Sequence, residues 1–121
     1  MPTETTAPVQ LTAANTNRDG TGTLVTVVTP GSLGSYVDQI DVIAPGNVTA
    51  GVVRIFTYDG TNHRLEDELI VPATTPSTSQ ACYRTTWRPS PPLYLPSGWL
   101  LKMSTHNAET FNVKARQRDK S

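Results

Sequence analysis

The sequence predicts an all-β fold, an antiparallel β-sandwich that is jelly-roll-like and has about eight strands. The clearest observation is the stretch 52–71, VVRIFTYDGTNHRLEDELIV, where two runs rich in apolar residues flank a tip that contains Asp59-Gly60. Because Gly accepts the positive φ of a tight turn, this pattern is typical of a β-hairpin. The same succession of short strand and turn recurs through most of the chain, and no window of ten or more residues shows a helical period.

The other strands are placed between polar, Gly-containing or Pro-containing breaks. In chain order we expect strands at 9–13, 24–29, 36–43, in both arms of the hairpin 52–71, and at 81–88, 93–95, 99–105 and 110–117. The sequence NTNRDGTGT (15–23) is expected to form a turn, and PATTPSTSQ (72–80) a connection. The prolines at positions 89, 91, 92 and 96 end the strands around them, because Pro cannot join a central ladder.

Alternation along these strands predicts which side chains face the core, since neighbouring residues of a strand point to opposite faces. The predicted inward residues are Leu24, Val28, Ile40, Val42, Val53, Ile55, Leu69, Trp99, Leu101, Met103, Phe111 and Val113.

The length of 121 residues suits one domain, which we divide into an N-terminal arm (1–10), a β-sandwich (11–117) and a C-terminal tail (118–121). The chain is only 36% hydrophobic and 7% aromatic. This is a thin core for a self-sufficient sandwich, so the composition favours stabilisation by a partner.

Charge is balanced, with 10 basic and 10 acidic residues, so no global attraction for nucleic acid or for a membrane is expected. Its distribution is uneven: residues 1–71 carry eight acids and three bases, whereas residues 82–121 carry seven bases and two acids. Such asymmetry favours head-to-tail association or docking on an acidic surface. The alternative, which we prefer, is that strands from the two halves pair and mix their charges.

Cys82 is the single cysteine, so no intramolecular disulfide can form, and it is expected to be a small buried apolar residue. The N-terminal sequence MPTETTAPVQ lacks the basic and apolar regions of a signal peptide, and no apolar run approaches membrane-spanning length. We therefore expect folding in a cytosol.

Three groups of polar residues resemble sites of chemistry, and each has a simpler interpretation. The spacing of Asn15, Asn17 and Asp19 before Gly20 overlaps the start of a calcium loop, but position twelve of that loop would be Thr26 rather than a bidentate Glu. Asn and Asp also stabilise tight turns without an ion.

His63 and His106, the two histidines, are expected in turns, and their spacing supports no metal site. The run Glu66-Asp67-Glu68 is expected to be a solvated outer surface rather than a pair of catalytic acids. We therefore expect no catalytic, cofactor or metal site.

The candidate interface residues lie in the second half of the chain. Lys114, Arg116, Arg118 and Lys120 recur with period two, which on a strand places them on one face as a cationic stripe. The stripe either grips an acidic protein surface or phosphates, or protects an edge strand from aggregation.

Three aromatic residues, Trp87, Tyr94 and Trp99, lie in or beside the Pro-rich segment 88–98. Trp99 stands in an apolar strand and is expected to be buried, so Trp87 and Tyr94 are the other interface candidates. If exposed, they would stack on sugars or anchor an interface; if buried, they would close one end of the sandwich.

Three blocks of the sequence together resemble short virion structural proteins of tailed bacteriophages and prophages. These blocks are NTNRDGTGT (15–23), GVVRIFTYDGTNHRL (51–65) and LPSGWLLKMSTHNAETFNV (95–113), and the resemblance extends roughly from Leu11 to Ala115. It supplies no catalytic motif, and the C-terminal KARQRDKS departs from it by adding the cationic stripe.

The resemblance implies a head decoration, or cement, protein rather than an enzyme. Such a protein would sit on the outer head surface of the virion at threefold points and clamp the major capsid protein, which favours a homo-oligomer, most simply a trimer. It would be assembled in the cytoplasm of the bacterial host. In this view the arm (1–10) and the cationic stripe contact the capsid, so deletion of residues 1–8 would weaken capsid binding and leave the isolated fold intact. The alternative is a tail or baseplate adsorption module that binds host glycan through Trp87 and Tyr94.

Overall fold

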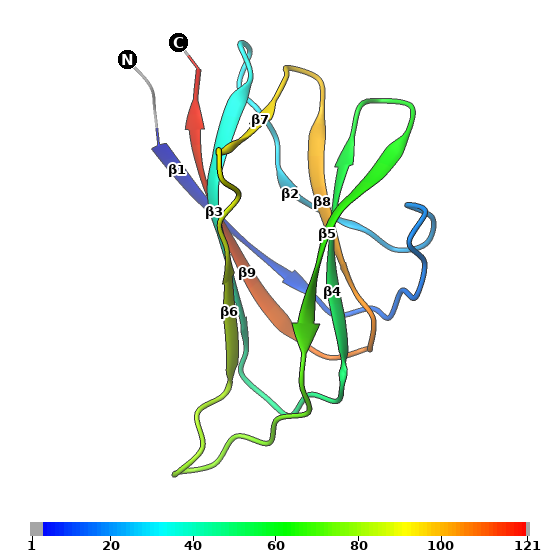
Figure 1. Cartoon of the computed structure of the whole chain (residues 1–121), viewed down its shortest axis with the longest axis vertical. Coiled ribbons are helices and arrows are strands. Elements are labelled where there is room, and N and C mark those ends of the chain that lie inside the picture. The colour runs from blue at the N-terminus through cyan, green and yellow to red at the C-terminus, as the bar shows by residue number, and fades with distance from the viewer. Residues whose placement is uncertain (1–3, 121) are drawn as a thin grey trace.

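The computed structural model describes residues 4–120, and the side chains of residues 8–120. Nine strands in this part of the chain form two antiparallel sheets that face each other, as Figure 1 shows. The strands are β1 (Glu4–Leu11), β2 (Val25–Val28), β3 (Ser35–Ala44), β4 (Gly51–Tyr58), β5 (His63–Val71), β6 (Tyr83–Trp87), β7 (Leu93–Leu95), β8 (Leu100–Thr105) and β9 (Phe111–Asp119).

Sheet A has the strand order β1-β9-β3-β6, with β7 also paired to β3, and sheet B has the order β2-β8-β4-β5. Strands β6 and β7 lie end to end along β3, opposite 40–44 and 35–37 respectively. Taken as one strand interrupted by Pro89, Pro91 and Pro92, they leave eight strands that pair first with last, second with seventh, third with sixth and fourth with fifth. This nested pairing is the jelly-roll topology, and it confirms the predicted fold class.

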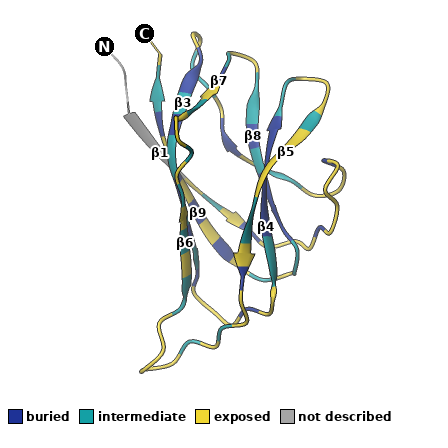
Figure 2. Ribbon diagram, in the orientation of Figure 1, coloured by how far each residue is buried: buried dark blue, intermediate teal, exposed yellow. Residues whose placement is uncertain are grey.

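The core lies between the two sheets, where Figure 2 shows buried residues on facing strands. Nine of the twelve predicted inward residues are buried, and the exceptions, Leu24, Leu69 and Trp99, are half-buried. Leu69 and Trp99 still pack against the core from its margin. Alternation therefore identified the core, because most strands bury only one face.

The structure corrects the expected N-terminal arm. Residues 4–10 form most of β1, which pairs with β9 from Glu4 opposite Arg118 to Leu11 opposite Phe111. Leu11 is buried, and Pro8 is tolerated because β1 is an edge strand with one partner. Residues 118–119, expected in a C-terminal tail, likewise belong to β9. The sandwich thus begins at Glu4, and residues 1–3 of the expected arm lie outside the described residues.

Between Glu4 and Lys120, no helix is long and apolar enough to cross a membrane.

Candidate functional site

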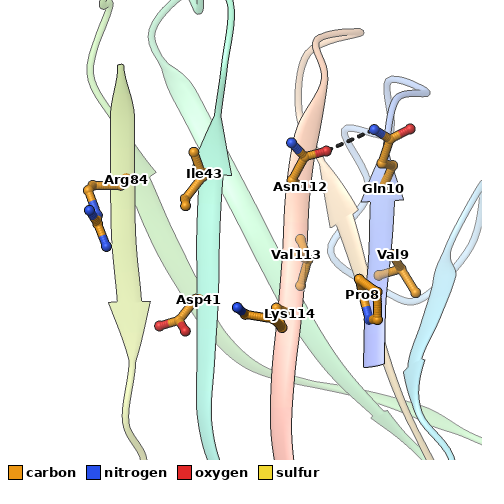
Figure 3. Close-up of a pocket in the computed structure, with 9 residues that line it drawn as sticks. All are labelled: Pro8, Val9, Gln10, Asp41, Ile43, Arg84, Asn112, Val113 and Lys114. Atoms are coloured by element: carbon orange, nitrogen blue, oxygen red, sulfur yellow. Dashed lines mark hydrogen bonds between the residues drawn. The ribbon is translucent and has the colours of Figure 1, made fainter. Parts of the chain in front are cut away.

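The outer face of sheet A carries most of the candidate interface residues. Alternate residues of its strands point away from the core, and the register aligns them in rows across the sheet. Two such rows, shown largely in Figure 3, are Gln10–Asn112–Ile43–Arg84 and Pro8–Lys114–Asp41–Thr86.

The cationic stripe lies on this face with the period that the sequence predicts. Lys114 and Arg116 are exposed, whereas Val113, Ala115 and Gln117 between and beside them are buried. Strand β9 lies between β1 and β3, so it is a central strand. The interpretation of the stripe as protection for an edge strand is therefore wrong.

The C-terminal end of the stripe is held by contacts to β3 and β7. Arg118 makes two hydrogen bonds to Asp38, of 2.7 and 3.0 Å, and its guanidinium lies 5.3 Å from the ring centre of Tyr36. The amine of Lys120 lies 5.6 Å from the ring centre of Tyr94. Because Asp38 comes from the acidic half of the chain and Arg118 from the basic half, the two halves mix their charges here, as we preferred.

Trp87 and Tyr94 do not share a surface. Trp87 is opposite buried Ile40, packs against the core and donates a hydrogen bond of 2.8 Å from its indole nitrogen to Asp67 of β5. Tyr94 is 39% exposed and lies on the outer face of sheet A, where its ring centre is 5.2 Å from that of Tyr36. The two aromatic residues therefore form no common stacking platform.

A shallow groove of about 630 Å³ crosses the outer face of sheet A (Figure 3). Arg84 on β6 and Lys114 on β9 supply its cations, and Asp41 on β3 lies between them. The groove was not predicted from the sequence, and neither was Arg84. The alternation in YRTTWR (83–88), with Arg84, Thr86 and Arg88 on one face, is the pattern that indicates this placement.

A second polar cluster lies on the outer face of sheet B and is centred on Arg54 of β4. Its side chain is only 1% exposed, although Arg is rarely buried without partners. It donates hydrogen bonds to Glu68 (2.8 Å) and to the carbonyl oxygen of Asn15 (3.0 Å), and it lies 3.2 Å from Nδ1 of His106. All three contacts satisfy the guanidinium, which removes much of the cost of burying it.

The loop 15–23 covers this cluster and is held by its own side chains. The amide of Asn15 donates to the carbonyl oxygens of Thr21 and Thr23, while Asp19 accepts hydrogen bonds from the backbone and hydroxyl of Thr21. These hydrogen bonds from Thr21 lower the pKa of Asp19. The spacing that resembles a calcium loop therefore serves a turn, as expected, and no cluster of metal-ligating side chains occurs in the described part of the chain.

Gly20 brings this loop against the hairpin. It has a φ of 89°, and a Cβ at this position would overlap the side chain of His63. His63 stacks on Tyr58, with 4.3 Å between ring centres, and burial together with the charge of Lys102 lowers its pKa.

The acidic run 66–68 is solvated at two of its three residues, and Glu68 is the exception. A β-bulge at Glu66 places Leu65 opposite Phe56 and Glu68 opposite Arg54, so Leu65 and Glu68 share the outer face. Glu68 pairs with both Arg54 and Arg18, and hydrogen bonds from Arg18 and then Arg54 lower its pKa. The prediction of a solvated surface is therefore confirmed for Glu66 and Asp67, which are exposed, whereas Glu68 is half-buried because it pairs with Arg54 and with Arg18 of the loop 15–23.

No protein-family model and no curated protein matches the chain. Among solved structures, a chain in the crystal structure of the T13 IBDV viral particle, described in terms of icosahedral virus evolution, is similar over 98% of this chain. The identity is 12% and the TM-score 0.46, and this chain spans 31% of the length of that one.

Proposed function

We propose that the protein is a bacteriophage virion structural protein, and specifically a capsid decoration (cement) protein that binds the outer head surface and stabilises the shell. The observation that carries this proposal is that the three blocks of the phage resemblance meet in one cluster. Asn15, Arg54 and His106 come from the three different blocks and are joined through the Arg54 guanidinium. The blocks therefore define a scaffold, which is what proteins that share a structural role would preserve.

The jelly-roll topology is compatible with this role. Double-sheet jelly rolls occur in viral capsids, in lectins and in cupins, so the topology alone does not assign a function. What favours a structural role here is a surface whose polar side chains are engaged in holding loops and strands together, as in the Arg54 cluster.

The adsorption module that binds host glycan is the second candidate, and it has lost its motivating feature. It uses Trp87, Tyr94 and the adjoining loop, but Trp87 packs against the core and Tyr94 lies on the outer face of sheet A, so the two rings offer no single stacking surface.

In the proposed role, many copies would bind equivalent positions on the shell and bridge neighbouring copies of the major capsid protein. Each contact need only be modest, because linked contacts raise the effective concentration of the next one. A trimer would match a threefold position and would engage several capsid subunits at once.

The direct test is to locate the protein on intact virions by cryo-electron microscopy, with heads from a phage that lacks its gene as the reference. We expect density for the sandwich at repeated positions on the shell, and heads that lack it should release DNA at lower temperature. Density confined to the tail or baseplate would overturn the proposal and favour the adsorption module.

A further inference from the structure

We propose that the outer face of sheet A is the attachment surface and that it binds an acidic protein surface. This inference rests on the proposed function in one respect: it takes that acidic surface to belong to the capsid. The earlier expectation concerned a stripe on a single strand, whereas the surface inferred here spans β1, β9, β3, β6 and β7.

The charges of this surface differ from those of the rest of the molecule. Among the side chains that the structure describes, six cations lie on it against two acids, a net charge of +4, while four cations and seven acids lie elsewhere, a net charge of −3. The six cations are Arg84, Arg88, Lys114, Arg116, Arg118 and Lys120, and the two acids are Asp38 and Asp41. Both halves of the chain therefore contribute charged residues to this face, and the face still has a net positive charge.

Two of these cations remain available to a partner. Neither Arg84 nor Lys114 has a hydrogen-bond or ion-pair partner within residues 8–120, and both line the groove across the sheet. Figure 3 shows them on either side of Asp41. Elsewhere on the molecule, by contrast, Arg18, Arg54 and Arg64 are each paired with a carboxylate.

A protein surface suits this face better than nucleic acid does. Asp41 lies between Arg84 and Lys114, and Asp38 lies beside Arg118, so a continuous phosphate backbone would meet two carboxylates. A protein partner can place its acidic groups opposite the cations and its donors opposite Asp41. The flat row of amides formed by Gln10 and Asn112, which hydrogen-bond to each other at 2.8 Å, adds polar contacts without net charge.

The size of the face predicts a weak contact for one copy. Four rows of strands about 4.8 Å apart, with β1, β9 and β3 of 8, 9 and 10 residues at about 3.4 Å per residue, cover roughly 19 by 31 Å, which is about 590 Å². This lies below the roughly 800 Å² per partner of a standard stable interface, so binding should depend on charge and on several linked copies.

The test compares two double variants that each remove two positive charges. Arg84→Gln/Lys114→Gln alters the proposed surface, and Arg18→Gln/Arg64→Gln is the matched control away from it, in the loop 15–23 and on β5 of sheet B. Wild type and both variants are bound to purified heads that lack the protein, at low and at high salt. In parallel, wild-type protein is titrated with a short polyglutamate peptide and, separately, with duplex DNA, and amide shifts are mapped by NMR.

We expect Arg84→Gln/Lys114→Gln to bind heads roughly tenfold more weakly at low salt, with a smaller salt dependence, while the control binds as the wild type does. Arg84→Lys/Lys114→Arg should restore binding. Normal binding by Arg84→Gln/Lys114→Gln together with a loss in the control would overturn the assignment of this face.

The peptide titration separates this inference from the proposed function. If wild type does not bind heads, the decoration role fails, but polyglutamate shifts confined to β9, β3 and β6 would still support an acid-binding protein surface. Absence of such shifts would overturn the inference. Stronger binding of duplex DNA through the same residues, or salt-sensitive self-association abolished by Arg84→Gln/Lys114→Gln, would overturn it in favour of nucleic acid or of a second copy.

Discussion

Arg54 is the centre of the polar contacts on the outer face of sheet B, and its burial could not be predicted from the sequence pattern. In VVRIF it stands among apolar side chains, and alternation places it on a face that ought to be solvated. The structure buries it because the loop 15–23 and Glu68 supply its partners. Partners so distant in the sequence cannot be inferred from local alternation, whereas the buried Val53 and Ile55 on either side could be.

Arg54→Met should lower the free energy of unfolding by about 2 kcal/mol, because it leaves the Asn15 carbonyl without its donor and Glu68 with Arg18 as its remaining partner. Urea denaturation measures this loss. Arg64→Met, which breaks the exposed pair with Asp59, is the control and should cost less than about 1 kcal/mol. Equal losses in the two variants would contradict the central role of Arg54.

His63 gives the fold a dependence on pH. Its pKa is lowered in the folded state by burial and by Lys102, so between about pH 6.5 and that lower pKa the unfolded chain binds more protons than the folded chain. The contribution of His63 to stability is therefore fully present above about pH 6.5 and is lost as the pH falls through its lowered pKa. Urea midpoints measured across the window should fall less steeply for His63→Phe, which keeps an aromatic ring beside Tyr58. An unchanged slope in that variant would assign the effect to other groups.

At the scale of elements, the strands and the hairpin were predictable because each has a local pattern. The hairpin tip formed as expected: Asp59 accepts hydrogen bonds from the backbone of Thr61 and Asn62, and these together with Arg64 lower its pKa to about 2. The bulge at Glu66 and the packing of the loop 15–23 on sheet B were not predictable. Both depend on contacts between residues that are far apart in the sequence. A one-residue shift in strand register has no sequence pattern by which it could be recognised.

Two glycines with similar backbone angles allow the effect of backbone strain on stability to be measured apart from the effect of a steric clash, when each is replaced by Ala. Gly20 and Gly60 have φ angles of 89° and 97°, but a Cβ at Gly20 would overlap His63, whereas a Cβ at Gly60 meets open space. Gly60→Ala should therefore cost about 1 kcal/mol for the left-handed backbone alone. Gly20→Ala should cost about 3 kcal/mol, since displacement of the loop is added. Chemical denaturation of the two variants gives both losses of unfolding free energy. Equal losses would show that the loop 15–23 can move away from His63 without a loss of stability.

For the whole molecule, the sequence predicted the class of fold and the site at different levels of detail. Short alternating strands are sufficient to indicate a sandwich, and period two is sufficient to place Lys114 and Arg116 on one face. The polar N-terminal residues, by contrast, carry too little apolar pattern to reveal a strand, and β1 exists because β9 offers it a complete ladder of partners. The groove on sheet A combines residues of four strands, so it follows from topology and not from any one segment.

Deletion of residues 1–8 is therefore expected to destabilise the fold, in contrast to the expectation from the sequence. It removes Glu4–Pro8, five residues of β1, together with their ladder to β9, and should lower the free energy of unfolding by about 2 kcal/mol or more. Deletion of residues 1–3 leaves β1 complete and serves as the control. Thermal and urea unfolding of both truncated proteins would decide this, and an undiminished midpoint for the longer deletion would show that β1 adds little.

The pairing of the first strand with the last also governs when the protein can fold. Leu11 lies opposite Phe111, so the outermost of the nested pairs joins residues a hundred positions apart, and sheet A cannot close until β9 has been synthesised. Topologies of such high contact order fold slowly, in milliseconds to seconds. The strands that are synthesised first stay unpaired until their partners near the end of the chain are available. A nascent chain should thus stay largely unstructured until β9 has left the ribosome, and during that interval Pro8 hinders the pairing of β1 with wrong partners.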